Sequence, residues 1–466
     1  MGSETPTQPR KSAHLKLFAS PEAPSFEQVS TCVHCGFCLE ACPTYRELRV
    51  EMDSPRGRLY LVKGLLKGQI EPGDEVLRHL DQCLDCRACE TACPSGVPYA
   101  EILERSRTVL EPLRQRPAAG RWLRRLFFER VLPSRRVQRV VLRTLWWAQS
   151  LGLLALGRRL ARLGWLPGRR LQAAAANPPL LPPRAFRDTV AKAFDPRGGT
   201  YVFPAQGARR HKVALFTGCL ADHMFASVNA DTVEVLTRNG CEVHVVPEEA
   251  CCGALHIHNG ARTEAVALAK RNIEAFAPHG FDAVISNAAG CGAELRHTQG
   301  LLPNDAEAVA FDHKVRDICE FLVEIGFETP RGPSGGSVLS LAYDEPCHLV
   351  HAQKVSAAPK QVLAALPGYR PVPLENADTC CGSAGLYAVL QPQLAGSILD
   401  RKLAALVASG AQVVATGNPG CLLQIGGGVG KAGLAMRVAH PVSLLAEAYR
   451  AESGPSSSSP RDERPM

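Results

Sequence analysis

Eight of the eighteen cysteines fall into two copies of one spacing, Cys-x2-Cys-x2-Cys-x3-Cys-Pro. Three thiolates at i, i+3 and i+6 can hold one face of a [4Fe–4S] cluster. In two-cluster proteins the fourth cysteine ligates the other cluster. We therefore expect two ligand sets: Cys32, Cys35, Cys38 and Cys93 for one cluster, and Cys83, Cys86, Cys89 and Cys42 for the other.

A pair of structural zinc sites is the alternative for these two runs. Zinc sites normally pair two Cys-x2-Cys knuckles and do not run four cysteines up to a proline. The spacing therefore favours iron–sulfur clusters, and we expect each fourth cysteine, Cys42 and Cys93, to open the helix that follows it.

The second half of the chain contains a duplication built around Cys-Cys-Gly. Three separate anchors recur at offsets of 128 to 130 residues, which indicates two modules with one chemistry. The matched cysteines are Cys219, Cys251, Cys252 and Cys291 in the first module and Cys347, Cys380, Cys381 and Cys421 in the second.

Each module alternates short apolar runs with helical patterns. The expected strands are 213–217, 242–246, 283–286, 338–342 and 413–416, and the expected helices are 230–238, 263–276, 357–366 and 398–409. Such alternation predicts parallel α/β layers. Cysteines that follow strands then lie at the carboxyl edge of a sheet, where open α/β folds assemble their sites.

The chemistry of the Cys-Cys-Gly modules stays open between an iron–sulfur centre, zinc and redox-active thiols without metal. Adjacent cysteines fit one tetrahedral ion poorly but can ligate different irons, and the glycine permits positive φ or close approach. Cys241 and Cys319 lie outside the repeat and are expected to be buried thiols, and His348 and His351 are not included among the ligands.

The net charge of +8 is concentrated in one stretch. Residues 121–170 contain thirteen Arg, all four Trp and a single acid, Glu129. The uncharged run 144–157 is too short to span a bilayer. Two interpretations remain: helices lying at a membrane interface, or a basic hairpin packed on a protein surface. No nucleic-acid-binding motif accompanies the charge, so we expect no nucleic-acid partner.

Length and composition divide the chain into several parts. No apolar signal segment precedes the first motif. Because cysteines that bind metal must stay reduced, we expect the protein to be located in the cytoplasm. The expected parts are a flexible N-terminus (1–24), a two-cluster domain (25–115), a basic helical segment (116–177), a Pro-rich linker (178–212), the first module (213–330), the second module (338–450) and a disordered tail (451–466).

Further motifs support a family resemblance. Between the two cysteine runs lies the stretch Asp53-Ser54-Pro55-Arg56-Gly57-Arg58-Leu59-Tyr60. The Cys-Cys-Gly motifs lie within the stretches Cys251–Ala254 and Cys380–Gly385. With these motifs the chain resembles the iron–sulfur subunits of glycolate oxidase (glycolate dehydrogenase), of the CCG-domain, heterodisulfide-reductase-like electron-transfer family. The expected fold is α+β and multidomain: a helical two-[4Fe–4S] ferredoxin-like domain followed by a duplicated α/β CCG-domain module.

The resemblance also implies a function. A subunit of this kind takes electrons from the flavin of an FAD-binding dehydrogenase subunit and passes them toward membrane quinone while glycolate is oxidised to glyoxylate. A further flavoprotein-like subunit is usual. The chain itself would hold two [4Fe–4S] clusters and one or two further iron–sulfur centres in the CCG modules. It would hold no flavin or NAD, have no catalytic residue, and lie peripherally on the inner face of the cell membrane.

Two other functions remain as alternatives. The chain could serve lactate or glycerol 3-phosphate oxidation, or it could be a thiol/disulfide enzyme like the heterodisulfide reductases. In those reductases each module ends in Cys-x2-Cys, whereas this chain has Glu294 and Gln424 at the last position. The missing thiols disfavour disulfide reduction.

Overall fold

The computed structural model describes residues 18–163, 181–332 and 337–452. Two compact units emerge. Unit 1 extends to Leu123 and includes the distant segment Leu255–Arg262, whereas unit 2 contains Arg124–Ala254 and the chain from Thr263 onward. The sequence did not predict that a segment following the first Cys-Cys-Gly motif belongs with the cysteine runs.

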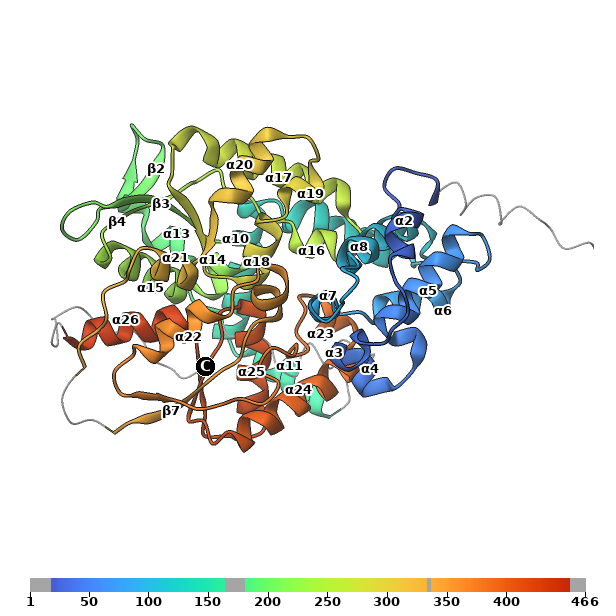
Figure 1. Ribbon diagram of the computed structural model, residues 1–466. Coiled ribbons are helices and arrows are strands. Elements are labelled where there is room, and N and C mark those ends of the chain that lie inside the picture. Colours follow the sequence, from blue (N-terminus) through green and yellow to red (C-terminus); the bar gives the residue numbers. More distant parts are fainter. Residues whose placement is uncertain (1–17, 164–180, 333–336, 453–466) are drawn as a thin grey trace, which may run out of the picture. The chain divides into compact units, whose positions relative to one another are not determined.

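Unit 1 is built from short helices, and no strand occurs among its described residues (Figure 1). Its helices are α2 (Phe26–Ser30), α3 (Cys38–Ala41), α4 (Pro43–Leu48), η1 (Glu51–Asp53), α5 (Pro55–Leu66), α6 (Asp74–Asp81), α7 (Ala88–Thr91), α8 (Tyr99–Leu110) and η2 (Glu111–Leu113), with α9 (Ala118–Arg125) and α16 (Ala254–Ile257) at its boundaries.

Helices α5, α6 and α8 supply the apolar core of unit 1. Leu65, Leu80 and Leu110 are fully buried in it, and several of the cysteines border the same cluster. Helix α5 starts sharply because Ser54 caps it by accepting a hydrogen bond from Gly57 and Pro55 occupies its first position. This start fixes where the next residues of the helix point.

The basic stretch forms a series of helices. After α9 come one turn of π-helix, η3 (Leu126–Val131), then α10 (Arg135–Ser150) and α11 (Leu153–Arg162). In the described part of the chain, no helix is long and apolar enough to cross a membrane.

The first module of unit 2 is a six-stranded sheet in the order β1-β2-β4-β3-β5-β6. Strands β3 to β6 run parallel, and β1 and β2 are antiparallel additions at one edge. The strands are β1 (Phe194–Asp195), β2 (Thr200–Phe203), β3 (His211–Phe216), β4 (Cys241–Val245), β5 (Ala283–Ser286) and β6 (Val315–Asp317).

The helices of this module cover the sheet and link its strands (Figure 1). They are α13 (Phe186–Thr189), η4 (Ala191–Ala193), α14 (Leu220–Met224), α15 (Ala226–Arg238), α17 (Arg262–Phe276), η5 (Ala277–His279), α18 (Ala289–Leu295), α19 (Thr298–Leu301), α20 (Ala306–Lys314) and α21 (Ile318–Glu324).

The second module is a four-stranded, fully parallel sheet in the order β10-β9-β7-β8. Its elements are β7 (Leu339–Tyr343), η6 (His348–Ala352), α22 (Ala357–Ala364), β8 (Tyr369–Pro371), α23 (Tyr387–Leu390), α24 (Pro392–Ala408), β9 (Val413–Ala415), α25 (Pro419–Lys431), β10 (Arg437–Ala439) and α26 (Pro441–Glu452). One apolar cluster contains Val235 and Leu236 of the first module and Leu363, Leu445 and Tyr449 of the second, so the modules share a core.

The five expected strands and four expected helices occur with shifted ends, as β3, β4, β5, β7 and β9 and as α15, α17, α22 and α24, whereas the short parallel strands β6, β8 and β10 were not expected. The expected linker 178–212 differs from the structure, because its described part forms α13, η4, β1, β2 and the start of β3. Its Pro and Gly residues indicated a linker, but they interrupt short edge strands that pair antiparallel. The N-terminus 1–17 and the tail from 453 lie outside the described residues.

Candidate iron–sulfur sites

Two cavities in unit 1 gather the eight cysteines into two groups. Each cavity contains three cysteines of one run and the fourth cysteine of the other, and Cys89 borders both. The first cavity is lined by Cys32, Cys35, Cys38 and Cys93, and the second by Cys83, Cys86, Cys89 and Cys42.

The two runs fold into the same loop. His34 and Asp85 occupy equivalent positions with φ of 56° in both, and Gly36 and Arg87 follow at 90° and 60°. Left-handed backbone at these positions is costly for residues other than glycine, so the second loop carries strain that its surroundings must hold. Beyond the loops the symmetry ends. Cys42 opens α4 as expected, whereas Cys93 is followed by a turn and α8 starts only at Tyr99.

The motif at the start of α5 places one arginine at each cavity. Arg56 lines the first cavity, pairs with Glu51 at 2.7 Å and donates to the carbonyl of His34 at 3.2 Å. Arg58 lines the second. Gly57 between them has no room for a side chain, because a Cβ there would lie 1.9 Å from the carbonyl oxygen of Glu51.

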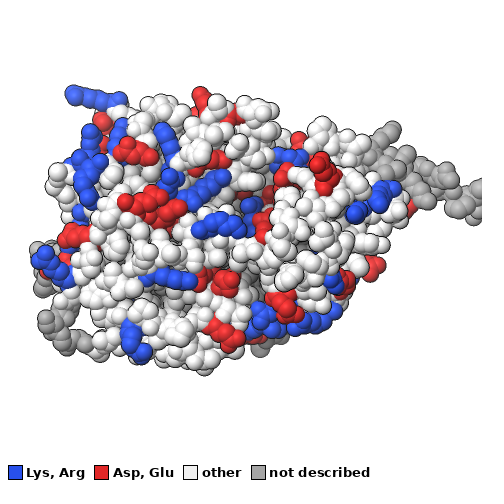
Figure 2. Space-filling view, in the orientation of Figure 1, with Lys and Arg blue, Asp and Glu red and all other residues white. Residues whose placement is uncertain are grey.

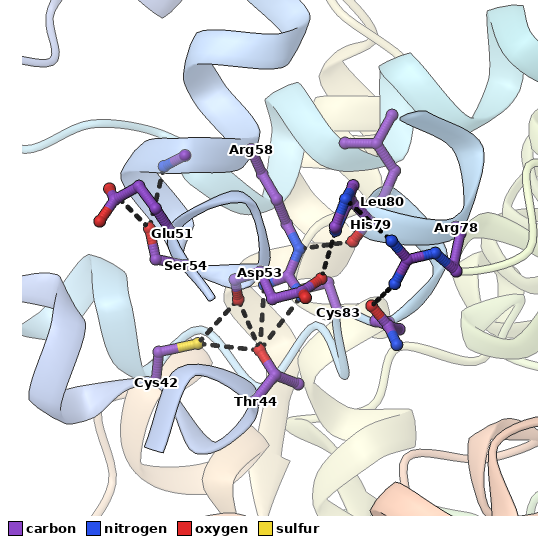
Figure 3. A network of polar contacts seen from close by, with 12 residues as sticks. Cys42, Thr44, Glu51, Asp53, Ser54, Arg58, Arg78, His79, Leu80 and Cys83 are labelled. Carbon is purple, nitrogen blue, oxygen red and sulfur yellow. Dashed lines mark hydrogen bonds and ion pairs between the residues drawn. The ribbon is translucent and has the colours of Figure 1, made fainter. Parts of the chain in front are cut away.

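Arg58 is buried at the centre of a polar network (Figure 3). Its guanidinium donates to Thr44 Oγ1 at 3.1 Å and to the carbonyl of His79 at 2.7 Å, and it lies 3.7 Å from the buried carboxylate of Asp53. Thr44 Oγ1 in turn lies 3.1 Å from the sulfur of Cys42. The network therefore places a fixed positive charge beside the second cavity and positions one of its cysteines.

A second buried charge network holds the strained loop of the second run. His258, from the segment 255–262, lies 3.0 Å from Asp85 and 3.4 Å from Glu104, while Arg107 and Arg87 pair with the same two acids. Burial alone would raise the pKa of Asp85, but the three cations outweigh it and hold that pKa below its usual range. Burial would also lower the pKa of His258, but the acids raise it to about 10.

These three residues could also be considered a metal site, because Asp85, Glu104 and His258 place their ligand atoms within 4.8 Å of one another. A protonated His258 and two adjacent guanidinium groups already neutralise the acids, so we interpret the cluster as structural. Among the described residues, no trio of cysteine sulfurs lies within the same 4.8 Å.

Three cysteines of the cavities have a raised thiol pKa. Burial raises the pKa of Cys83 and Cys89, and it raises the pKa of Cys38 to about 11. Thiols must lose their protons to ligate metal, so loading of either cavity would release protons. Tyr99 Oη contacts the sulfur of Cys83 at 3.6 Å and the backbone N–H of Asp85 donates to it at 3.4 Å, contacts that also suit a ligating thiolate.

The cysteines of the first CCG module meet at the carboxyl ends of β3, β4 and β5. Cys219 caps α14, its sulfur lies 3.3 Å from that of Cys251, and contacts continue through Cys252 to Cys291 in the first turn of α18. Buried Glu249 secures the turn before Cys219 by accepting from the backbone of Thr217 and Gly218 and pairing with two arginines, Arg135 and Arg187.

The second module repeats the arrangement with different charges. Its thiols also form a chain of contacts, from Cys347 through Cys380 and Cys381 to Cys421. Here the buried cation is Lys402, whose Nζ lies 3.0 Å from Asp344. Both Cys-Cys-Gly glycines have the positive φ that the sequence suggested, and a Cβ at Gly382 would lie 2.6 Å from a backbone oxygen.

The two CCG sites lie against each other within unit 2. The backbone N–H of Ala289 donates to the carbonyl of Gly417 at 3.1 Å, and that of Gly290 donates to Asn418 Oδ1 at 3.2 Å. Asn418 also donates to the sulfur of Cys421 at 3.4 Å. The loops that carry Cys291 and Cys421 are thus joined, which the duplication alone did not reveal.

Several residues of these sites carried no sequence signal of their role. Glu249, Lys402 and His258 are isolated charges in the sequence, and only their burial beside a cysteine loop marks them. Cys241 and Cys319 are buried apart from the CCG sets, as expected. The Gly-x-Gly-x2-Gly stretch from Gly428 begins inside helix α25, without the strand and loop that a nucleotide site requires.

Models of three protein families match successive parts of this chain. The 4Fe-4S dicluster domain matches residues 28–97, and the cysteine-rich domain matches twice, over 213–296 and 341–426. Between them, residues 119–176 match the linker region of the glycolate oxidase iron–sulfur subunit. Fold and families together define a multidomain iron–sulfur electron-transfer protein.

Relatives specify the family further. The chain is 38% identical to the probable glycolate oxidase iron–sulfur subunit of Bacillus subtilis, covering 90% of this chain and 94% of the relative, and 34% identical to the glycolate oxidase iron–sulfur subunit of Escherichia coli, covering 84% and 88%. The chain belongs to the family of glycolate oxidase iron–sulfur subunits and is part of an oxidoreductase complex. Lactate utilization protein A of Exiguobacterium is also similar, at 31% identity over 51% of this chain and 98% of that protein.

Proposed function

We propose that this chain carries electrons from the flavin of a partner dehydrogenase subunit toward membrane quinone while glycolate is oxidised to glyoxylate. The ligands are the two four-cysteine sets of unit 1, and the CCG cysteines hold one or two further iron–sulfur centres. The single observation that carries this proposal is the pair of cavities, each gathering three cysteines of one run with the fourth of the other. A bound [4Fe–4S] cluster supplies one-electron transfer, which lets a two-electron flavin feed a one-electron chain.

The first cavity is the point where electrons enter from the partner. Cys35 is exposed there, and Val33 and Phe37 of the same loop are each 68% exposed. An exposed apolar rim around a redox site suits docking of another protein, and electron tunnelling requires close approach. The second cavity is enclosed by buried charges and suits an internal step.

The basic helices provide contact with the membrane surface. Val140, Leu145, Trp147 and Leu151 of the α10 region are exposed, and arginines are interspersed with them. On the face drawn in Figure 2, by contrast, basic and acidic side chains lie next to one another in several places. Mixed Arg, Trp and aliphatic side chains suit shallow burial at an anionic bilayer, and they support a peripheral position on the inner face of the cell membrane.

A reconstitution experiment tests the electron-transfer role. The purified chain alone should not reduce an artificial dye with glycolate, and activity should appear when the flavoprotein partner is added. Dye reduction by this chain alone, without flavin, would overturn the proposal. Lactate and glycerol 3-phosphate in the same assay test the alternative substrates.

A further inference from the structure

An open cavity of about 360 Å³ lies in unit 2 beside α10, apart from the cysteine sites. Three arginines line it: Arg139 and Arg143 from one face of α10, and Arg184 from the segment before α13. Its single acidic lining residue, Asp188, is paired with Arg139 at 2.9 Å. We refer to these residues together with His223 as the arginine cavity.

The charge inside the arginine cavity favours an anion. Burial, together with nearby Arg135 and Arg139, lowers the pKa of His223 to about 4 against the opposing effect of Asp188, so the imidazole is neutral at pH 7. Three guanidinium groups against one carboxylate leave an excess of two positive charges. Guanidinium groups bind phosphate oxygens in bidentate fashion, and a neutral imidazole can donate one further hydrogen bond.

The wall of this cavity is held in place by specific contacts. Gln149, near the end of α10, accepts from the backbone N–H of Leu181 at 3.0 Å and donates to the carbonyl of the same residue at 3.2 Å. The backbone N–H of Arg187 donates to buried Asp222 at 3.2 Å. The segment that carries Arg184 is therefore fixed against α10 at Leu181 and against α14 at Arg187.

We propose that the arginine cavity binds the phosphate group of an anionic membrane lipid. The helix that supplies Arg139 and Arg143 also exposes Val140 and Trp147 on the adjacent side, so the approach that buries these two side chains in lipid brings headgroup phosphates to the arginines. The inference rests on the membrane contact proposed above and adds a defined lipid site to it.

Vesicle sedimentation of the full-length iron-loaded protein tests the site. An Arg139→Gln/Arg143→Gln/Arg184→Gln variant is compared with Arg130→Gln/Arg136→Gln/Arg159→Gln, which removes the same charge from exposed positions outside the cavity. An exposed arginine near an anionic surface contributes about fivefold in affinity. On phosphatidylglycerol vesicles the cavity variant should lose at least about tenfold more affinity than the control. Equal losses would overturn the proposal.

Two further measurements distinguish a lipid phosphate site from the alternatives. Asp188→Asn removes the competing carboxylate and should strengthen vesicle binding about two- to fivefold; no gain counts against the site. Inorganic phosphate should displace the protein from vesicles more than chloride at equal ionic strength. If phosphate binding depends on the cavity arginines but vesicle binding does not, the site takes free phosphate and the lipid assignment is wrong. Glycolate-dependent dye reduction with the partner, measured in parallel, reports separately on the electron-transfer proposal.

Discussion

The two cysteine cavities of unit 1 are formed by the same loop with the same left-handed positions, yet their surroundings differ in nearly every respect. Around the first, Cys35, Val33 and Phe37 are exposed, and its arginine, Arg56, is partly exposed in a pair with Glu51. Around the second, Arg58 is buried to 1% exposure and is held by a carboxylate, a hydroxyl and a carbonyl.

The difference shows how one ligand motif can serve two roles. A loop sequence fixes where thiols can gather, whereas burial, sulfur hydrogen bonds and nearby charge set the reduction potential of what they hold. The exposed rim of the first cavity suits exchange with a partner protein. A buried guanidinium beside the second cavity favours the state that carries one more electron, so we expect the second centre to have the higher potential.

The largest expected effect comes from removing one thiol of the enclosed cavity. Cys86→Ser should lose about four iron atoms per chain, the content of one cluster, and with them glycolate-dependent dye reduction in the complex. Iron analysis and EPR of the reduced protein measure this. Cys241→Ser is the matched control, because that thiol is also buried but belongs to neither quartet. Unchanged iron in Cys86→Ser would refute the assignment.

The second prediction compares the two arginines. Arg58→Met removes the guanidinium from the buried Asp53, which keeps His79 at 2.7 Å, and should cost about 3 kcal/mol of stability, the lower end for breaking buried ion pairs. Arg56→Met at the partly exposed pair should cost less than about 1 kcal/mol. Thermal unfolding of both anaerobic proteins measures the difference, and equal losses would contradict the comparison.

A conservative variant separates charge from packing at the same position. Arg58→Lys keeps a cation beside the second cavity, so it should preserve more of the reduction potential of that centre than Arg58→Met, which should shift it to more negative values. EPR-monitored redox titration reads this shift. A purely structural role for Arg58 would leave the potential unchanged in every variant that retains its iron.

The third prediction concerns pH. His258 has a folded-state pKa of about 10, raised from an ordinary value near 6.5, so its stabilising contribution is complete below about pH 6.5 and is lost as pH rises through 10. The wild-type unfolding temperature should therefore fall between pH 7 and 10 more steeply than that of His258→Gln.

His34→Gln is the control for the pH experiment. His34 occupies the first-loop position that corresponds to Asp85, but its side chain is exposed. Its variant should follow the wild-type curve. Parallel curves for wild type and His258→Gln would show that the buried charges beside Asp85 do not depend on this histidine.

Sequence reasoning succeeded where a signal is local. Apolar runs predicted β3, β4, β5, β7 and β9, because such runs depend on neighbours along the chain. The cysteine spacing predicted two four-cysteine ligand sets; each cavity gathers the cysteines of one set, and their role as cluster ligands stays a prediction. In the sequence, the motif that contains Arg58 indicates only a family resemblance. Its physical role depends on Thr44 and His79, which are 14 and 21 residues away.

Long-range contacts explain the structural features that the sequence did not predict. Arg107 donates to the carbonyl of His258, 151 residues further along the chain, and no local pattern encodes such a pairing. Strands β1 and β2 were missed because they are short, lie at an edge and are surrounded by Pro and Gly, so edge pairing overrides their weak local preference.

The smallest expected effect tests one hydrogen bond to sulfur. Tyr99→Phe keeps the ring that borders both cavities but removes the hydroxyl that lies 3.6 Å from the sulfur of Cys83. A hydrogen bond to a sulfur ligand stabilises the more negative, reduced state, so its loss should lower the potential of the second centre. One such bond contributes about 0.5–1.5 kcal/mol, which corresponds to roughly 20–60 mV for a one-electron couple. The first centre should keep its potential, because the removed hydroxyl contacts only a cysteine of the second quartet. A redox titration that resolves both EPR signals decides the matter: a shift of the first signal, or equal shifts of both, would mean that the two cavities are not tuned independently.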